Sequence, residues 1–382
     1  MTSTDHDDDF RSDFSGKYQE ESAKMGRFNL AVFGLSGVGK STLINAIFGK
    51  DVAPTGTGRP VTTGSHLYAH DSGQLGIYDT QGIELGTDGA RALADVRAFV
   101  EAQRAKPLEE QIHVAYYCVR GMDGRIQPFE EEFVRGLHDL GLPVILVLTQ
   151  VPKRGEQYHD RVVEVAQYIY ETGLPIYLGR PILTNALADP ALGFPQHGLV
   201  ELLDLTFEVA PEGVESALAA AQKIDMRRKR AAALKRIEVA TAAATTAGAS
   251  PIPFSDAVVL VPIQLGMMAS ISVTYDIPVN TALAASITAT SLATQTGRAA
   301  AVGLLKLIPG AGTVAGGVVS ATVAGSFTFA MGIAWREVCE GIVAGKFGAI
   351  GSWDEAGIKA AFATVLKEQF TRQMKLRKNK DE

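Results

Sequence analysis

A glycine-rich segment near the start of the chain combines the residue types that can hold a phosphate group. Residues 34–41 read Gly-Leu-Ser-Gly-Val-Gly-Lys-Ser, which fits the pattern G-x-x-x-x-G-K-[ST]. Glycines let successive backbone N–H groups converge on phosphate oxygens, and the N-terminus of a following helix adds partial positive charge. Residues 28–33 have the composition of a buried strand, and residues 42–48 have the apolar spacing of a helix. This context predicts a P-loop that binds a nucleoside triphosphate or its diphosphate.

The residue types within the segment indicate separate roles. Lys40 is expected to reach the β- and γ-phosphates and to act in catalysis, and the Ser41 hydroxyl is expected to bind Mg²⁺. The other residues of the segment that we predict to bind the nucleotide lie in the loop and the first helical turn: Gly34, Ser36, Gly37, Val38, Gly39 and Thr42.

A second motif begins at Asp79, 39 residues after Lys40 of the P-loop. Residues 79–82 read Asp-Thr-Gln-Gly and come after a predicted strand. An aspartate there can hold Mg²⁺ through water, and the Gly82 N–H, our second predicted catalytic group, can contact a γ-phosphate and lose that contact after hydrolysis. The loop between the motifs contains Thr62 and Thr63, and either hydroxyl could complete the Mg²⁺ shell. We assign this role to Thr63, so the predicted metal ligands are Ser41, Thr63 and Asp79.

The elements that position these motifs alternate between strand and helix from residue 26 to about residue 210. Strands are predicted at 28–33, 65–69, 75–79, 113–119, 143–149 and 176–183. Helices are predicted at 41–48, 90–105, 128–140, 160–172 and 199–207. This order predicts an α/β fold, in which a mostly parallel sheet carries helices on both faces. The turn at 71–73 predicts a hairpin, so one edge of the sheet is expected to be antiparallel.

The P-loop, the threonine loop and the Asp-x-x-Gly motif together resemble the first three motifs of a regulatory GTPase of the Era/TrmE kind. The resemblance covers about residues 26–210. It implies the fold of a P-loop NTPase G domain, binding of GTP and GDP, dependence on Mg²⁺, slow hydrolysis and two switch loops.

The residues expected to contact the base depart from that family. Its members read guanine with an [N/T]-K-x-D motif, whereas residues 149–152 of this chain read Thr-Gln-Val-Pro. Thr149 matches the motif, but Gln150 replaces the lysine and Pro152 replaces the discriminating aspartate. Asn185 and Ala186 resemble the second base-contact loop of the family. We therefore predict base contacts from Thr149, Gln150, Asn185 and Ala186, with weak discrimination between GTP and ATP as an open alternative.

The residues expected to assist hydrolysis also depart from the family. Ile83 stands where many small GTPases carry the glutamine that orients water, and an apolar side chain cannot orient a nucleophile by hydrogen bonding. Gly37 stands where potassium-activated members carry asparagine. Arg59 could stabilise developing charge or could simply be a solvated loop residue. These departures leave open a nucleotide-gated binding module with negligible hydrolysis.

Composition bounds the class of protein. The chain has 382 residues, of which 46% are apolar, and this predicts more than one domain with ample core. Cys118 and Cys339 lack metal-ligand spacing, so we expect reduced core cysteines of a cytosolic protein rather than a disulfide framework. No basic segment followed by an apolar stretch opens the chain, and secretion is not expected.

Charge divides the chain into segments. Residues 1–25 carry seven acidic and three basic residues and are predicted to be a disordered tail. Residues 211–382 carry thirteen acidic and eighteen basic residues, and this excess of positive charge predicts that the segment contacts an anionic surface. After the predicted G domain at 26–210, we expect a basic Ala-rich helix within 211–248, an uncharged all-α domain rich in Ala and Gly at 249–345, and an amphipathic helix with a basic tail at 346–382.

The uncharged region allows two interpretations. Residues 257–275 and 307–335 are uncharged and are long enough to cross a membrane of about 30 Å. A small-xxx-small pattern at 312–316 would let helices approach closely in lipid. However, several prolines and many Gly, Ser and Thr residues lower the hydropathy, so buried helices of a soluble Ala-rich bundle are the alternative.

Residues 250–256 and 304–312, followed by a Gly/Ala/Thr run, resemble the YcjF-type domain of unknown function over about residues 235–345. That resemblance implies membrane association. The sequence as a whole therefore predicts a Mg²⁺-dependent, slow GTPase switch on the cytoplasmic side of a membrane, with anionic lipid and an unidentified protein as partners. The alternatives are the binding module with negligible hydrolysis and a soluble RNA- or ribosome-associated GTPase. The absence of a recognisable RNA-binding module disfavours nucleic acid.

Overall fold

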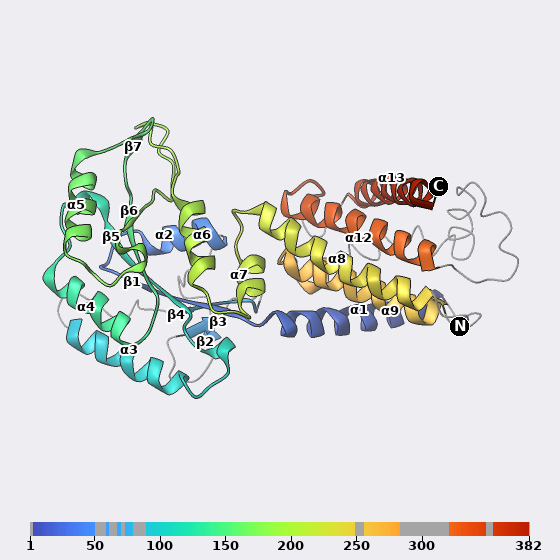
Figure 1. Cartoon of the computed structure of the whole chain (residues 1–382), viewed down its shortest axis with the longest axis horizontal. Helices are drawn as coiled ribbons and strands as arrows, with labels where there is room; N and C mark the ends of the chain where they lie inside the picture. Colours follow the sequence, from blue (N-terminus) through green and yellow to red (C-terminus); the bar gives the residue numbers. More distant parts are fainter. Residues whose placement is uncertain are drawn as a thin grey trace, which may run out of the picture. The chain divides into compact units, whose positions relative to one another are not determined.

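The structure of the protein is a computed structural model, and it describes residues 3–49, 59–60, 67–69, 73–78, 89–248, 256–282, 321–348 and 354–381. The chain divides into two compact units (Figure 1). One is an α/β unit over Met25–Met226, and the other is a helical unit that joins Met1–Lys24 to Arg227–Glu382.

The described strands of the α/β unit form a seven-stranded sheet in the order β2-β3-β4-β1-β5-β6-β9. Neighbours are parallel from β4 to β9, and β3 pairs antiparallel with β4 and β2. The parallel sheet and the antiparallel edge are therefore confirmed. The bounds are β1 Phe28–Phe33, β2 Arg59–Pro60, β3 Leu67–Ala69, β4 Leu75–Tyr78, β5 Val114–Arg120, β6 Val144–Thr149 and β9 Ile182–Leu183.

Helices cover both faces of this sheet (Figure 1). Successive side chains of a strand point to opposite faces, so Leu30 and Val32 of β1 enter one hydrophobic cluster and Ala31 and Phe33 enter the other. The first cluster is closed by α2 (Lys40–Phe48), α6 (Leu199–Val209) and α7 (Glu215–Ala221). The second is closed by α3 (Gly89–Gln103), α4 (Pro128–Asp139) and α5 (Asp160–Glu171).

The predicted strand at 176–183 is wrong in its first part. Tyr177–Gly179 form a short 3-10 turn, and only Ile182–Leu183 pair with β6. Leu178 has a φ of 60° and Gly179 a φ of 65°. Because a strand needs negative φ values, the apolar run cannot continue as β structure through these residues.

The prediction of one basic Ala-rich helix within residues 211–248 is also wrong. α7 ends at Ala221, and α8 (Met226–Gly248) begins after a turn. The buried side chain of Gln222 makes this turn, because its Oε1 accepts hydrogen bonds from the N–H groups of Ile224 and Asp225 at 2.9 and 2.7 Å. Such local side-chain bonds compete with helical backbone bonds. α7 buries its alanines in the α/β core, so this unit extends past the predicted boundary at residue 210.

One buried histidine, directly before β5, gives the α/β unit a dependence on pH. His113 Nδ1 accepts from the N–H of Asn29 at 2.9 Å, and Nε2 lies 2.7 Å from the carbonyl of Leu108, which fits a neutral ring. Burial lowers the pKa of His113 below its ordinary value, and the positive charge of Arg27 acts in the same direction. The unfolded chain therefore binds a proton more readily than the folded one.

We expect the stability contributed by neutral His113 to be complete above the ordinary histidine pKa of about 6.5 and to be lost as the pH falls toward the lower folded-state pKa. The thermal midpoint of the full chain should drop over this acidic range, and His113→Gln should flatten the drop. His138→Gln, at an exposed position on α4, is the matched control. Equal pH slopes for wild type and His113→Gln would contradict the assignment.

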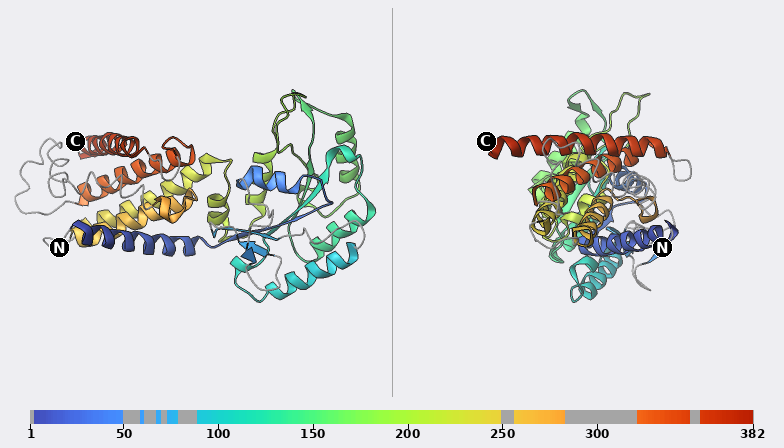
Figure 2. Two further views of the ribbon diagram at one scale, coloured as in Figure 1. Left: turned by 180° about the vertical axis from the view of Figure 1, so that it is seen from behind. Right: turned by 90° about the vertical axis from the view of Figure 1, so that its right-hand side faces the viewer.

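The helical unit is built from five described helices. They are α1 Ser3–Met25, which ends at the unit boundary, α8, α9 Asp256–Thr274, α12 Ala321–Val343 and α13 Glu355–Asp381. Four of them run alongside one another and α13 lies across them (Figure 2). Trp335 lies fully buried at the centre, where its Nε1 donates to the carbonyl of Met268 at 2.9 Å and to Ser272 Oγ at 3.1 Å. The predicted all-α region is thus confirmed in its described part.

The N-terminal segment is not the disordered tail that its acidic composition predicts. Phe14 on α1 is fully buried, and the Tyr18 hydroxyl donates to the carbonyl of Ile277 at 2.7 Å. Glu21 lies 3.9 Å from Arg236 of α8. Composition indicated disorder because the acidic residues outnumber the apolar ones, but these contacts come from segments more than 200 residues away in the chain.

Two basic residues of α8 have hydrogen-bond partners within the helical unit. Lys229 is fully buried and donates from Nζ to the carbonyl of Thr274 at 3.0 Å. Arg230 donates twice from Nε and once from Nη2 to the carboxylate of Glu340, at 2.6–3.0 Å. Burial acts to raise the pKa of Glu340, but the hydrogen bonds from Arg230 and Tyr275 outweigh it and lower this pKa. Lys229 and Arg230 therefore bind partners within the helical unit.

No helix within the described parts of the chain is both long enough and apolar enough to cross a membrane. The predicted small-xxx-small pattern at 312–316 lies outside the described residues.

Candidate nucleotide site

The glycine-rich segment forms a loop between β1 and α2, at the carboxyl end of the central strand. Gly34, Gly37 and Gly39 have positive φ values of 128°, 78° and 98°. A Cβ atom at Gly34 would lie 2.2 Å from the carbonyl oxygen of Cys118 on β5, so only glycine fits there. The loop therefore takes its path from local backbone freedom and from close contact with the neighbouring strand.

Lys40 opens α2, and its side chain folds back over the loop. Its Nζ donates to the carbonyls of Gly34 at 2.8 Å and Leu35 at 2.9 Å. The ammonium group thus lies within the curve of the loop, which is the position from which it can meet phosphate oxygens.

The other predicted residues of the loop fall into an inner and an outer set. Val38 is only 4% exposed and anchors the loop in the core. Ser36 and Gly37 are exposed, Ser41 is half-buried in the first turn of α2, and Thr42 is exposed one residue later. Backbone N–H groups and a hydroxyl are therefore presented together at one helix N-terminus.

Thr149 and Gln150, at the end of β6, fasten the loop from the other side. Thr149 Oγ1 is buried and lies within hydrogen-bond distance of the carbonyls of Val38 and Val119. Gln150 Nε2 donates to the carbonyl of Gly37 at 3.2 Å. Two residues predicted to contact the base therefore also hold the P-loop in place.

A cavity of about 680 Å³ adjoins the loop. It brings together six predicted nucleotide-binding residues: Gly39, Thr42, Thr149, Gln150, Asn185 and Ala186. It is also lined by residues that the sequence did not indicate: Arg120, Met122, Val151, His159, Leu187, Ala188, Asp189, Pro190, Leu192 and Phe194. No spacing rule could find the second group, because it comes from the ends of three strands and a long loop that meet only in the folded chain.

The loop after β9 is held in shape by its own hydrogen bonds. Asn185 and His197 exchange backbone bonds at 3.1 Å, and Asn185 Nδ2 donates to the carbonyl of Pro195 at 2.8 Å. A small hairpin of β7 (Lys153–Arg154) and β8 (Gln157–Tyr158) reaches this loop, where the Arg154 guanidinium lies 5.6 Å from the centre of the Phe194 ring. The cavity wall is therefore a built structure rather than a loose connection.

Three of the predicted chemical groups cannot be placed. Thr63, Asp79 and Gly82 lie outside the described residues, as do Thr62 and Ile83. Arg59 lies in β2, and nothing is described of its side chain. In the parts of the chain that the structure covers, there is no group of three or more His, Cys, Asp or Glu residues that could hold a metal ion.

Cys118 lies beneath the P-loop and is fully buried. Burial raises the pKa of its thiol to about 12, so it stays protonated at neutral pH. Both cysteines are free and buried, which confirms the prediction of reduced core residues.

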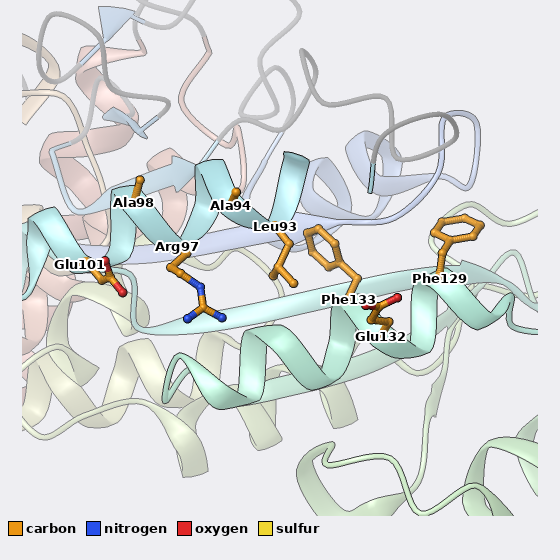
Figure 3. Close-up of a pocket in the computed structure, with 8 residues that line it drawn as sticks. All are labelled: Leu93, Ala94, Arg97, Ala98, Glu101, Phe129, Glu132 and Phe133. Atoms are coloured by element: carbon orange, nitrogen blue, oxygen red, sulfur yellow. The ribbon is translucent and has the colours of Figure 1, made fainter. Parts of the chain in front are cut away.

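A second cavity, of about 410 Å³, lies between α3 and α4 (Figure 3). Leu93 and Phe133 line it together with Arg97, and Glu101 and Glu132 bring two carboxylates. None of the residues predicted to bind nucleotide lines this cavity. The cavity beside the P-loop is therefore the candidate site.

Comparison with known proteins identifies the kind of domain that carries this site. Residues 29–150 match the family described as 50S ribosome-binding GTPase. These residues form a P-loop GTPase domain. The resemblance to Era-type GTPases is confirmed at this level, whereas the matched residues do not reach the region that resembles the YcjF-type domain.

Curated relatives agree with this GTPase domain. The chain is 28% identical over 186 residues to the GTPase Der of Halalkalibacterium halodurans. The aligned residues are 48% of this chain and 37% of that protein. It is 31% identical over 126 residues to the GTPase Era of Lactobacillus delbrueckii subsp. bulgaricus, covering 32% and 38%. It is 24% identical over 157 residues to the probable GTP-binding protein EngB of Aquifex aeolicus, covering 41% and 84%. The chain thus spans less than two fifths of the length of the Der and Era proteins.

Proposed function

We propose that this protein binds GTP and GDP with Mg²⁺, hydrolyses GTP slowly, and acts as a nucleotide switch for its helical unit. The observation that carries the proposal is the position of Lys40. Its ammonium group is held by Gly34 and Leu35 within the P-loop curve, next to a cavity of about 680 Å³ that can receive a base. Phosphate oxygens would replace these two carbonyls as acceptors, because they carry negative charge.

The residues available at the loop fit a Mg²⁺ site of the P-loop type. Mg²⁺ binds oxygen ligands, and only a few of these ligands come from the protein. The Ser41 hydroxyl lies in the first turn of α2, where it can supply one such ligand. Thr63 and Asp79 are proposed to complete the set, and Gly82 is proposed to sense the γ-phosphate. When bound, the ion would neutralise charge on the β- and γ-phosphates.

Slow hydrolysis follows from the residue at position 83. Ile83 cannot hydrogen-bond a water molecule, so the chain itself supplies less help to the attacking nucleophile than a glutamine would. We expect the purified full chain to bind a fluorescent GTP analogue only when Mg²⁺ is present. We also expect it to release phosphate from GTP in a single-turnover assay. If no phosphate is released with or without lipid vesicles, the protein is a nucleotide-gated binding module rather than an enzyme.

We further propose that the helical unit meets a membrane on its cytoplasmic side. The support is compositional, since residues 239–335 contain only four charged side chains and Lys375 and Arg377 begin a basic tail. Flotation of the full chain with vesicles that contain anionic lipid, and with neutral vesicles as the control, measures this contact. Failure of the protein to float with either the anionic or the neutral vesicles would contradict the membrane proposal. Full release of vesicle-bound protein by a carbonate wash would exclude integral insertion.

Ribosome association is the second candidate, favoured by the description of the matched family as a 50S ribosome-binding GTPase. Co-sedimentation of the full chain with ribosomal subunits in the presence of GTP or GDP distinguishes ribosome association from membrane association. Nucleotide-dependent pelleting with the large subunit, without flotation, would favour the ribosome over the membrane.

A further inference from the structure

The cavity beside the P-loop is lined by a single carboxylate, which the GTPase motifs did not indicate. Among its lining residues, Asp189 is the one acidic side chain and Arg120 is the one side chain that is always cationic. Pro152 also lines the cavity, at the place where the family has its base-reading aspartate, and its ring can neither donate nor accept a hydrogen bond. Asp189 comes from a different segment, the loop after β9.

Asp189 is held in a defined position by both its backbone and its side chain. Its N–H donates to the carbonyl of Phe194 at 2.8 Å, and the N–H of Phe194 donates back at 2.9 Å. Its Oδ1 accepts from the N–H groups of Ala191 at 3.0 Å and Leu192 at 3.1 Å. One carboxylate oxygen is therefore used within the loop, while Oδ2 has no hydrogen-bond partner within the described part of the chain.

A hydrogen-bond donor stands on the same loop. Ala186 lines the cavity, and its backbone N–H has no acceptor among the residues that the structure describes. The cavity is thus lined by a negatively charged acceptor at Asp189 and a backbone donor at Ala186, together with Thr149 and Gln150.

We propose that Asp189 takes over the reading of the base and makes this a guanine site. The proposal rests on the proposed nucleotide-binding function. Guanine presents N–H donors at N1 and N2 that suit a carboxylate, and a carbonyl O6 that suits a backbone N–H. Adenine presents an N6 donor and an N1 acceptor, so it would set donor against donor at Ala186 and acceptor against acceptor at Asp189. Pro152 is then tolerated because the carboxylate comes from a different segment that lines the same cavity.

The test is competition of unlabelled nucleotides against a fluorescent GDP analogue on the full chain. On wild type, ATP is expected to bind at least about a hundredfold more weakly than GTP, and ITP, which lacks the N2 amine, about tenfold more weakly. Asp189→Asn keeps the side-chain oxygen that Ala191 and Leu192 need and replaces the other oxygen with an amide. Because that amide donates, GTP affinity should fall about tenfold to a hundredfold, and affinity for XTP, which has a carbonyl at C2, should rise.

Asp139→Asn is the matched control, since Asp139 is exposed at the end of α4 and does not line the cavity. Its nucleotide preferences should equal those of wild type. Equal binding of GTP and ATP to wild type, or an unchanged GTP-to-XTP ratio in Asp189→Asn, would overturn the role of Asp189 while the nucleotide-binding function stands. A wild-type chain that binds no nucleotide would overturn both.

Discussion

Replacement of Lys40 by alanine is expected to lower the affinity of the full chain for GTP by about a hundredfold, because a charge-assisted hydrogen bond contributes about 1.5–3 kcal/mol. The variant also removes the donor that the carbonyls of Gly34 and Leu35 share. Titration with a fluorescent GTP analogue in the presence of Mg²⁺ measures the effect.

Lys106→Ala is the control for that experiment. Lys106 belongs to the same unit, and its ammonium is paired with Glu110 at 3.3 Å on the surface. Its loss should leave nucleotide affinity unchanged and cost at most about 1 kcal/mol of stability. If Lys40→Ala binds GTP within a few-fold of wild type while remaining folded, the P-loop does not hold the phosphates.

Replacement of Trp335 by alanine is expected to destabilise the helical unit by about 3–5 kcal/mol. The side chain extends from α12 toward α9 and is fully buried, and its removal leaves a cavity and takes away the indole N–H that Met268 O and Ser272 Oγ accept. A Cβ at Gly332 would lie 2.7 Å from Ile237, so α12 is already in close contact with α8 and has little freedom to fill the space. Urea unfolding of the full chain followed by far-ultraviolet circular dichroism measures the shift.

Two further variants separate packing from general damage to the helical unit. Trp335→Phe keeps one aromatic ring and loses the donor together with the fused five-membered ring, so its cost should lie between wild type and Trp335→Ala. Val239→Ala on α8 is the neutral control, because Val239 is 66% exposed. A Trp335→Ala chain with the wild-type unfolding midpoint would show that the unit is not held together through this residue.

The P-loop and its two flanking elements were predictable because they depend on neighbours in the sequence. The strand Phe28–Phe33 agrees with its prediction at both ends, and α2 begins one residue before the predicted position. Glycine spacing reports local backbone freedom, and apolar spacing reports the buried face of an element. Both signals are present within residues 28–48.

The wall of the base cavity was not predictable in the same way. Thr149, Gln150, Asn185 and Ala186 were found only by resemblance, and Asp189 was not found at all. Its role depends on a loop whose shape is held by pairs such as Asp189 with Phe194, and on a hairpin that reaches the loop from another part of the chain. Composition and spacing carry no information about such contacts between segments that are distant in the sequence.

The sequence by itself determined the phosphate-binding loop, the alternation of strands and helices around it, and the helical character of the C-terminal region. Only the tertiary structure decided that the acidic N-terminal segment forms α1, that Lys229 and Arg230 bind internal partners, and that Asp189 reaches the cavity. The physical reason is the range of the interactions. Loop and helix formation follow from bonds between residues a few positions apart, whereas burial and charge pairing depend on which distant segments the folded chain brings together.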